Sequence, residues 1–259
     1  MIDVTGLSFG YSNRSQVLKD VSFKAGRGEI INILGPNGCG KSTLIKTILG
    51  FLKVERGMVK IKGHDIRDLS RHEMADMLSY VPQHHAGVFS YSVLDLVLMG
   101  RYTTSPWHSY SDEDYESAYT ALDRVRMRKH AERAYLHLSG GERQLILIAR
   151  ALAQKAEYFI MDEPVSGLDY GNQFMLLQVI KELSEEGLSF ILTTHHPEHA
   201  VFLGGRSLLI KEGKVMGDGE SYDVITTNCI CNLYNMPREL VEKFSDMHYA
   251  RKNIGTSIS

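Results

Sequence analysis

The sequence predicts an α/β fold, in which a mainly parallel sheet is flanked by helices and accompanied by a small antiparallel sheet and a helical subdomain. Short apolar runs alternate with amphipathic stretches along most of the chain, and strands that alternate with helices form parallel sheets. The first 30 residues and the segment 57–62 differ, because Val, Ile and Phe alternate there with polar residues and Gly stands at the turns. That pattern is typical of an antiparallel sheet.

The parallel core is expected to contain three strands and two helices. Continuous apolar runs predict buried strands over 29–34, 158–161 and 188–193. Apolar residues at helical spacing predict helices over 41–49 and 172–186. A glycine follows each of these helices, at the position where glycine commonly ends a helix.

A further helical zone is expected over 92–135. Ser111 is placed to cap a helix whose first turn is acidic and whose far end is basic, which matches the helix dipole. The apolar face of this helix is expected to contain Tyr115, Ala118, Tyr119, Leu122 and Val125.

Composition excludes several classes of protein. The 259 residues are 43% hydrophobic and 23% charged, which is typical of a folded globular chain. Lys and Arg number 29 against 31 Asp and Glu, a net charge of −2, so no general basic field is available for nucleic acid. Three cysteines give no disulfide framework, and neither a signal peptide nor an 18-residue apolar run is visible. We expect a cytosolic protein that meets a membrane only through a partner.

Residues 35–42, GPNGCGKS, fit the phosphate-loop pattern G-x-x-x-x-G-K-[ST] between a predicted strand and a predicted helix. Glycines let backbone N–H groups turn toward phosphate oxygens, and the helix N-terminus adds positive potential. Lys41 is expected to bind the β- and γ-phosphates and Ser42 to bind Mg²⁺. The expected nucleotide contacts are Gly35, Pro36, Asn37, Gly38, Cys39, Gly40, Lys41, Ser42 and Thr43.

Two carboxylates follow the apolar run 158–161. Asp162 and Glu163 would emerge at the carboxyl end of a buried strand, where open α/β sheets bind ligands. Asp162 is expected to hold Mg²⁺, mostly through water, and Glu163 to polarise an attacking water.

A second anion-binding arrangement is predicted at 138–144, LSGGERQ, directly before a helix expected over 145–154. Ser-Gly-Gly at a helix N-terminus presents free N–H groups to an anion. An ordinary capped helix start explains the same residues equally well.

The segment 138–144 resembles the signature motif of ATP-binding-cassette (ABC) ATPases. The family's other motifs follow in order. Tyr11 stands where the family has an aromatic residue that stacks on adenine, and Gln83 resembles the Q-loop glutamine. Residues 166–169, SGLD, resemble the D-loop, and His195 in Thr-Thr-His resembles the switch histidine. A Tyr ring offers a flat π-face to a purine, although packing beneath the small sheet is the alternative for Tyr11.

The resemblance covers about residues 2–227 and implies a P-loop NTPase core. It implies an ABC ATPase domain over 1–227, with a helical signature subdomain at about 84–155, and a C-terminal helical extension over 228–259. Residues 91–101, YSVLDLVLMGR, are most similar to importer ATPases for iron-siderophore, haem and cobalamin cargo.

The family's chemistry implies ATP as substrate and Mg²⁺ as cofactor. The implied catalytic residues are Glu163 as base, His195 at the γ-phosphate, Lys41 and Gln83. The implied metal ligands are Ser42, Gln83 and Asp162, and the further ATP contacts are Ser139, Gly140, Gly141 and Asp169.

The resemblance also implies partners. These are membrane permease subunits, a second copy of the chain in a head-to-tail dimer that shares two nucleotides, and indirectly a substrate-binding protein, but no nucleic acid. The location implied is the cytoplasmic face of the cell membrane. The alternatives are the ATPase of another transporter class, either a molybdate or metal importer or an exporter, and a soluble ABC ATPase that acts on nucleic acid.

Some residues depart from the family pattern or stay outside it. His196 follows the switch histidine where Asp is common, and Val165 stands before the D-loop where Thr is commoner. Cys229 and Cys231 form C-x-C without further matched ligands, so we interpret them as buried or idle cysteines.

The segment 84–110 is predicted to grip the permease. It follows Gln83 directly, carries little charge, and is rich in aromatic residues. These are Phe89, Tyr91, Tyr102 and Trp107, whose alternative is to pack inside the helical subdomain. His84 and His85 are expected to belong to a surface contact rather than to a metal site, because a lone pair of histidines makes an incomplete metal site.

Overall fold

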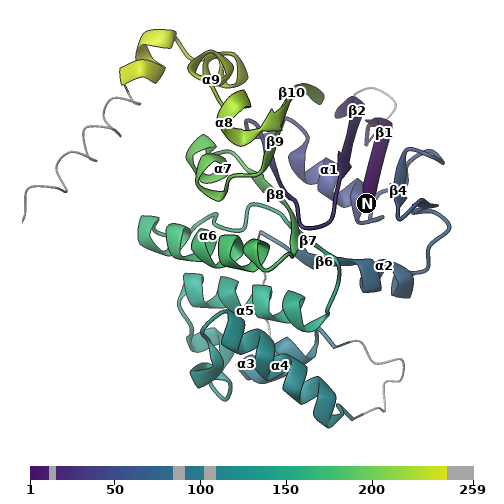
Figure 1. The fold of residues 1–259 in the computed structure, drawn as a ribbon, viewed down its shortest axis with the longest axis vertical. Coiled ribbons are helices and arrows are strands. Elements are labelled where there is room, and N and C mark those ends of the chain that lie inside the picture. The colour runs from purple at the N-terminus through teal and green to yellow at the C-terminus, as the bar shows by residue number, and fades with distance from the viewer. Residues whose placement is uncertain (12–15, 84–90, 102–108, 244–259) are drawn as a thin grey trace, which may run out of the picture.

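The computed structural model describes residues 1–11, 16–83, 91–101 and 109–243 of the chain. A six-stranded sheet crosses the molecule, with helices on both of its faces (Figure 1). Its strand order is β10 (Lys214–Glu220), β9 (Arg206–Lys211), β3 (Ile30–Leu34), β8 (Ser189–Thr194), β7 (Tyr158–Met161) and β6 (Leu78–Val81). All neighbours are parallel except β10 and β9. The predicted mainly parallel core is therefore confirmed.

A four-stranded antiparallel sheet lies beside this core (Figure 1). Its order is β2 (Leu18–Ala25), β1 (Ile2–Phe9), β4 (Val59–Ile61) and β5 (His64–Asp65). From Val21 to Ala25, alternate residues of β2 are buried, as expected where one face of an antiparallel sheet covers a core. The predicted antiparallel subdomain is also confirmed.

Nine α-helices complete the part of the chain that the structure describes. They are α1 (Lys41–Ile48), α2 (Arg71–Met77), α3 (Val93–Leu98), α4 (Asp112–Arg124), α5 (Gly140–Ala153), α6 (Tyr170–Glu185), α7 (Pro197–Leu203), α8 (Ser221–Val224) and α9 (Thr227–Tyr234). Two differ from the predicted bounds at their starts. Helix α5 begins at Gly140 rather than 145 because Ser139 caps it, and α6 begins at Tyr170 rather than 172 because Asp169 caps it.

The side chains of β7 divide the core into two layers. Phe159 and Met161 point into a cluster with α3, α4, α5 and α6, whereas Tyr158 and Ile160 point into a cluster with α1 and the antiparallel sheet. Successive residues of a strand face opposite sides of a sheet, so α1 and α5 cover opposite faces.

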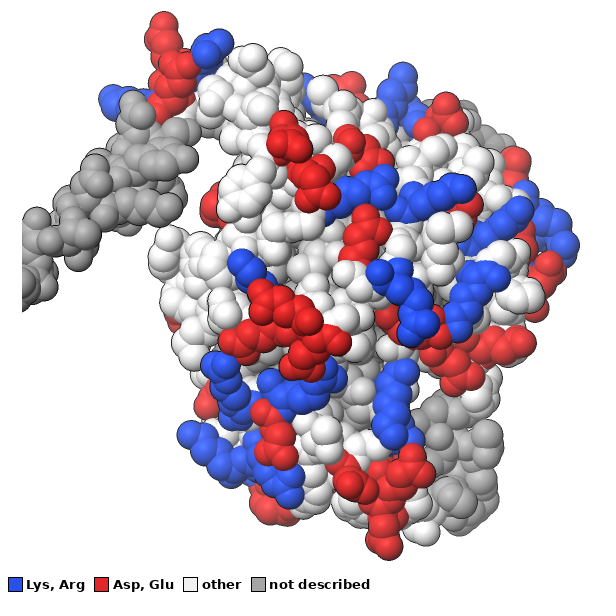
Figure 2. Space-filling model, viewed as in Figure 1, with Lys and Arg blue, Asp and Glu red and all other residues white. Residues whose placement is uncertain are grey.

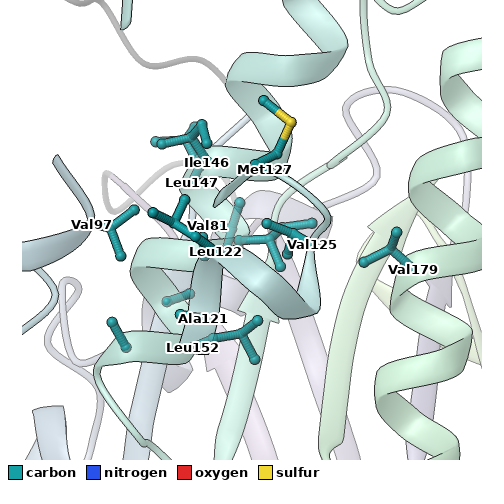
Figure 3. Close-up of a cluster of buried hydrophobic side chains, with 14 of the residues drawn as sticks. Val81, Val97, Ala121, Leu122, Val125, Met127, Ile146, Leu147, Leu152 and Val179 are labelled. Atoms are coloured by element: carbon teal, nitrogen blue, oxygen red, sulfur yellow. The ribbon is translucent and has the colours of Figure 1, made fainter. Parts of the chain in front are cut away.

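The helical subdomain is held by apolar contacts between α3, α4 and α5 (Figure 3). Val97, Leu122 and Leu147, one from each helix, are at most 1% exposed. Tyr115 was expected on the buried face of α4 but is 41% exposed; it stands in the first turn of the helix and meets Tyr110 edge to face.

The surface agrees with the near-neutral composition. Acidic and basic side chains are interspersed over the face drawn in Figure 2. Among the described helices, none combines the length and the apolar character needed to cross a bilayer.

Asp114 links the start of α4 to the end of α5. Its carboxylate accepts hydrogen bonds from Arg101, at 2.8 Å, and from the backbone and hydroxyl of Ser111. Arg101 also donates to the carbonyl of Ala153. These hydrogen bonds, of which the one from Arg101 has the largest effect, lower the pKa of Asp114 from 3.8 to about 2. Because the folded-state pKa is the lower one, this stabilisation is present above about pH 4 and is lost as the pH falls toward 2.

Replacement of Asp114 by Asn should destabilise the fold at neutral pH by about 1–2 kcal/mol, since the cap and the Arg101 pair are both weakened. Thermal unfolding at pH 7 and at pH 3 measures the effect, which should shrink at the lower pH. The matched control is Asp112→Asn, in the same first turn but exposed. Equal melting temperatures for Asp114→Asn and the unmodified chain at pH 7 would contradict the assignment.

Candidate functional site

The predicted phosphate loop lies between β3 and α1 and has a backbone that only glycine fits. Gly38 and Gly40 have φ of +80° and +111°, in the left-handed region. A Cβ atom at Gly35 would lie 2.2 Å from the carbonyl oxygen of Ile210, in the neighbouring strand β9. The loop therefore needs glycine at Gly38 and Gly40 for their backbone conformation and at Gly35 for the close approach of β9.

Lys41, the first residue of α1, points back into this loop. Its side chain is 4% exposed, and its Nζ donates to the carbonyls of Gly35 at 2.8 Å and Pro36 at 3.2 Å. The same Nζ lies 3.4 Å from Oε1 of Glu163. A buried ammonium beside free N–H groups at a helix start suits a phosphate group.

Asp162 follows β7 and is 6% exposed. Its Oδ1 accepts hydrogen bonds from the hydroxyls of Ser42, at 3.1 Å, and Thr193, at 2.7 Å. The Thr193 hydroxyl also accepts from the backbone N–H of Glu163 at 2.8 Å. Thr193 was not predicted as a site residue, although a polar side chain at the carboxyl end of an apolar strand is the signal that could have found it.

Glu163 brings the predicted catalytic residues together. Its Oε2 accepts a hydrogen bond from Gln83 Nε2 at 3.3 Å. The same oxygen lies 3.3 Å from His195 Nδ1, but the geometry of that contact does not satisfy a hydrogen bond. With Lys41 on Oε1, three predicted residues converge on one carboxylate. Glu163 also has φ of +45°, a strained conformation that is uncommon for a residue with a side chain.

A small cavity of about 90 Å³ lies beside this carboxylate. Its lining includes Glu163, Ser166, Gly167, Thr194 and His195. The space is large enough for water, and its walls supply several polar partners for it. The site therefore has room for a water molecule next to a carboxylate and an imidazole.

The oxygen ligands that Mg²⁺ requires are present in part. Ser42 and Asp162 already face each other, and hydroxyl and carboxylate oxygens are the donors that a hard divalent cation takes. Gln83, the third predicted ligand, instead donates to Glu163 and to Ser166, the latter at 3.0 Å. The structure thus brings two of the three predicted ligands into contact.

The segment of Ser139, Gly140 and Gly141 forms the start of α5. Ser139 caps the helix and forms a capping box with Glu142. This is the ordinary capped helix start that the sequence offered as an alternative to an anion site. A Cβ at Gly141 would lie 2.9 Å from Asn172, whose backbone N–H and amide group donate to Asp169. The predicted signature and D-loop residues are therefore neighbours, on the sheet face opposite α1.

Tyr11 lies on the surface beside the phosphate loop. It is 61% exposed, and its hydroxyl lies 3.3 Å from that of Thr43 in α1. Its ring meets Phe9 edge to face, with centroids 5.2 Å apart. An exposed ring at this place is available for stacking, and it is not buried beneath the small sheet.

His196 lines the same small cavity as Glu163, and its Nδ1 lies 3.2 Å from Glu198. Ligand atoms of His196, Glu198 and His199 lie within 4.8 Å of one another, but they stand at the start of α7, where the helix dipole opposes a cation. Burial lowers the pKa of His199 to about 4, so its ring is neutral, and it packs edge to face on Phe174. Packing explains the place of His199, whereas His196 and Glu198 are partly exposed.

The three cysteines are free thiols. Cys39 is buried in the phosphate loop, and burial raises its pKa. Cys229 and Cys231 are partly buried in α9, and the prediction that they bind no metal stays a prediction. His84, His85, Phe89, Tyr102 and Trp107 lie outside the described residues.

Residues 18–166 match the family model described as ABC transporter. The chain belongs to the ABC transporter family. It is 34% identical over 238 residues to the molybdate import ATP-binding protein MolC of Haemophilus influenzae, and the aligned region covers 91% of this chain and 88% of the relative. It is 32% identical over 237 residues to the iron(3+)-hydroxamate import ATP-binding protein FhuC of Bacillus subtilis, with coverage of 91% and 88%.

A solved structure agrees with this membership. A metal-chelate type ABC transporter in an inward-facing conformation superposes with a TM-score of 0.80 at 33% identity, covering 91% of this chain and 89% of that one. The resemblance inferred from the sequence motifs is therefore confirmed, and the chain is an ABC ATPase. The roles assigned to individual residues stay predictions.

Lys41→Ala should weaken MgATP binding to this ABC ATPase at least about tenfold, because a phosphate loses its buried ionic partner. Equilibrium binding of a fluorescent ATP analogue measures the loss, and ATPase turnover should fall with it. Lys46→Ala, on the same helix, is the matched control and should bind normally. An unchanged affinity of Lys41→Ala for the ATP analogue would contradict the assignment of residues 35–42 as the phosphate loop.

Proposed function

We propose that the chain is the ATP-hydrolysing subunit of an ABC importer, and that it couples MgATP binding and hydrolysis to uptake of a metal chelate through a membrane permease. The observation that carries the enzymatic part is the convergence of Lys41, Gln83 and His195 on the carboxylate of Glu163. Relatives named for molybdate and iron-hydroxamate import support the transport part.

Hydrolysis would use the groups around the cavity. Glu163 would accept a proton from a water held there, while His195 contacts the γ-phosphate. Lys41 would exchange its bonds to loop carbonyls for bonds to phosphate oxygens, where negative charge develops. Mg²⁺, held by Ser42 and Asp162, would supply Lewis-acid stabilisation of phosphate charge.

A second copy of the chain would complete the site. The phosphate-loop helix α1 and the signature helix α5 cover opposite faces of the central sheet. A symmetric head-to-tail pair would place Ser139, Gly140 and Gly141 of each copy against the nucleotide in the other. Tyr11 would stack on the adenine from the exposed side of the loop.

The permease contact is proposed next to Gln83, within the predicted segment 84–110. In the described part of that segment, the side chain of Tyr91 is 40% exposed. The carbonyl of Tyr91 accepts a hydrogen bond from the backbone N–H of Tyr135, and the next residue, Leu136, is 38% exposed. Exposed apolar side chains next to a site residue suit a coupling surface, since movement at Glu163 can reach Gln83 directly. The chain would then act at the cytoplasmic face of the membrane.

The cargo would contact the permease and a substrate-binding protein rather than this subunit. We propose a metal chelate of the iron-siderophore, haem or cobalamin type, because residues 91–101 resemble those importers. Molybdate is the second candidate, on the likeness to MolC. Purification of the intact complex and identification of the bound cargo by mass spectrometry and metal analysis distinguish the two.

Glu163→Gln should retain MgATP binding but hydrolyse ATP at least about 100-fold more slowly, because the shape of the side chain is kept and its basicity is lost. Size-exclusion chromatography with MgATP should show an accumulated dimer. Glu185→Gln, at the exposed end of α6, is the control and should turn over normally. Normal turnover and no dimer in Glu163→Gln would exclude this residue as the base.

Tyr91→Asp should release the permease in a pull-down while MgATP affinity stays unchanged, since a charge is buried at the proposed contact. Tyr222→Asp, on α8 and 74% exposed, is the control for adding a charge at a surface tyrosine. If the complex survives Tyr91→Asp, the contact surface lies elsewhere. Loss of ATP binding would mean that Tyr91 is a structural residue.

A further inference from the structure

We propose that Tyr234, at the end of α9, is a positioning residue for His195, and that the helix α9 thereby sets the geometry of the switch histidine. The hydroxyl of Tyr234 donates a hydrogen bond to the backbone carbonyl of His195 at 2.8 Å, across 39 residues of sequence. The inference rests on the proposed role of His195 in hydrolysis.

Helix α9 is anchored to the central sheet, so the place of this hydroxyl is fixed. Leu233, next to Tyr234, is 1% exposed and packs against Leu34 of β3 and Leu209 of β9. Lys211, at the end of β9, donates to the carbonyl of Asn232 and, at 2.6 Å, to the side chain of Asn235, which caps the helix. The helix is thus held at its last turn by the two strands on which it rests.

The strand β3 also leads directly into the phosphate loop. Leu34 is its last residue, and Gly35 begins the loop. The same strand therefore supports the phosphate loop on one side and, through Leu233, the residue that reaches the switch histidine. This arrangement keeps His195 in a constant place relative to Lys41.

His195 is held by the chain on both sides, since Thr194, directly before it, pairs with Leu34 of β3. It follows β8, which ends at Thr194, and precedes α7, which begins at Pro197. Its ring contacts that of His196 at a tilt of 40°, with centroids 4.1 Å apart, and its Nδ1 lies 3.3 Å from Glu163 without hydrogen-bond geometry. The bond from Tyr234 to its carbonyl adds a side-chain support beyond the end of β8, at the backbone from which the ring projects.

The donor is suited to a permanent role. Tyr234 is partly buried, and burial raises the pKa of its hydroxyl well above the ordinary value of 10. The hydroxyl consequently stays protonated and able to donate across the whole pH range in which ATP hydrolysis is measured. The contact acts as a fixed support and does not switch with pH.

The test is Tyr234→Phe, which keeps the ring packed and removes only the donor. ATP hydrolysis by the full-length chain should show a kcat about threefold to tenfold lower, with KM for ATP changed less than about twofold. Tyr222→Phe, on α8 and exposed, is the matched control and should leave both constants unchanged. An unchanged kcat in Tyr234→Phe would overturn the proposal.

A double-mutant cycle with His195→Ala separates positioning from simple stabilisation. If Tyr234 acts through His195, Tyr234→Phe should have no further effect on kcat in the His195→Ala background. The same fold-loss in both backgrounds overturns the proposal, because the hydroxyl would then act elsewhere. Wild-type turnover in His195→Ala alone identifies a failure of the proposed function, whereas an impaired His195→Ala with a silent Tyr234→Phe identifies a failure of this inference only.

A spectroscopic measurement covers the case in which turnover of the double mutant is too low to compare. The NMR signal of the His195 ring should shift in Tyr234→Phe and stay unchanged in Tyr222→Phe. An unchanged ring signal in Tyr234→Phe would overturn the proposal independently of any rate.

Discussion

The register between β7 and β8 is the constraint on which the site depends. Met161 pairs with Leu192, so the next residues, Asp162 and Thr193, emerge side by side at the carboxyl edge of the sheet. One hydroxyl, that of Thr193, then bonds both to the carboxylate of Asp162 and to the backbone N–H of Glu163. A slip of one residue would turn every side chain of the strand to the other face and remove this bridge.

Burial requires that the charged groups of the site have partners. Asp162 and Lys41 are almost fully buried, and a buried charge is tolerated only where partners surround it. The two hydroxyl bonds to Asp162 and the loop carbonyls on Lys41 supply those partners. Glu163 keeps a strained backbone beside them, which indicates that the surrounding contacts over-determine its position.

The central sheet and the helices packed on it bring together site residues that lie far apart in the sequence. Strand β3 leads into the phosphate loop, and Leu34 of β3 and Leu209 of β9 together support the helix α9, which reaches the backbone of His195. The helices α1 and α5 occupy separate faces, so the two predicted anion-binding helix starts belong to different layers. The geometry of one copy thus supports an arrangement in which two copies share the nucleotides.

Local patterns in the sequence determined the strands, the main helices and the ordered motifs, because apolar periodicity, glycine positions and caps act over a few residues. They also predicted Lys41, Asp162 and Glu163 as site residues, whereas the resemblance to ABC ATPases implied His195. Only the tertiary structure decided that Thr193 joins the carboxylate of Asp162 to the backbone N–H of Glu163, and that Tyr234 reaches His195. Those contacts join segments 30 and 39 residues apart, and they depend on strand register and helix packing, which local pattern does not encode.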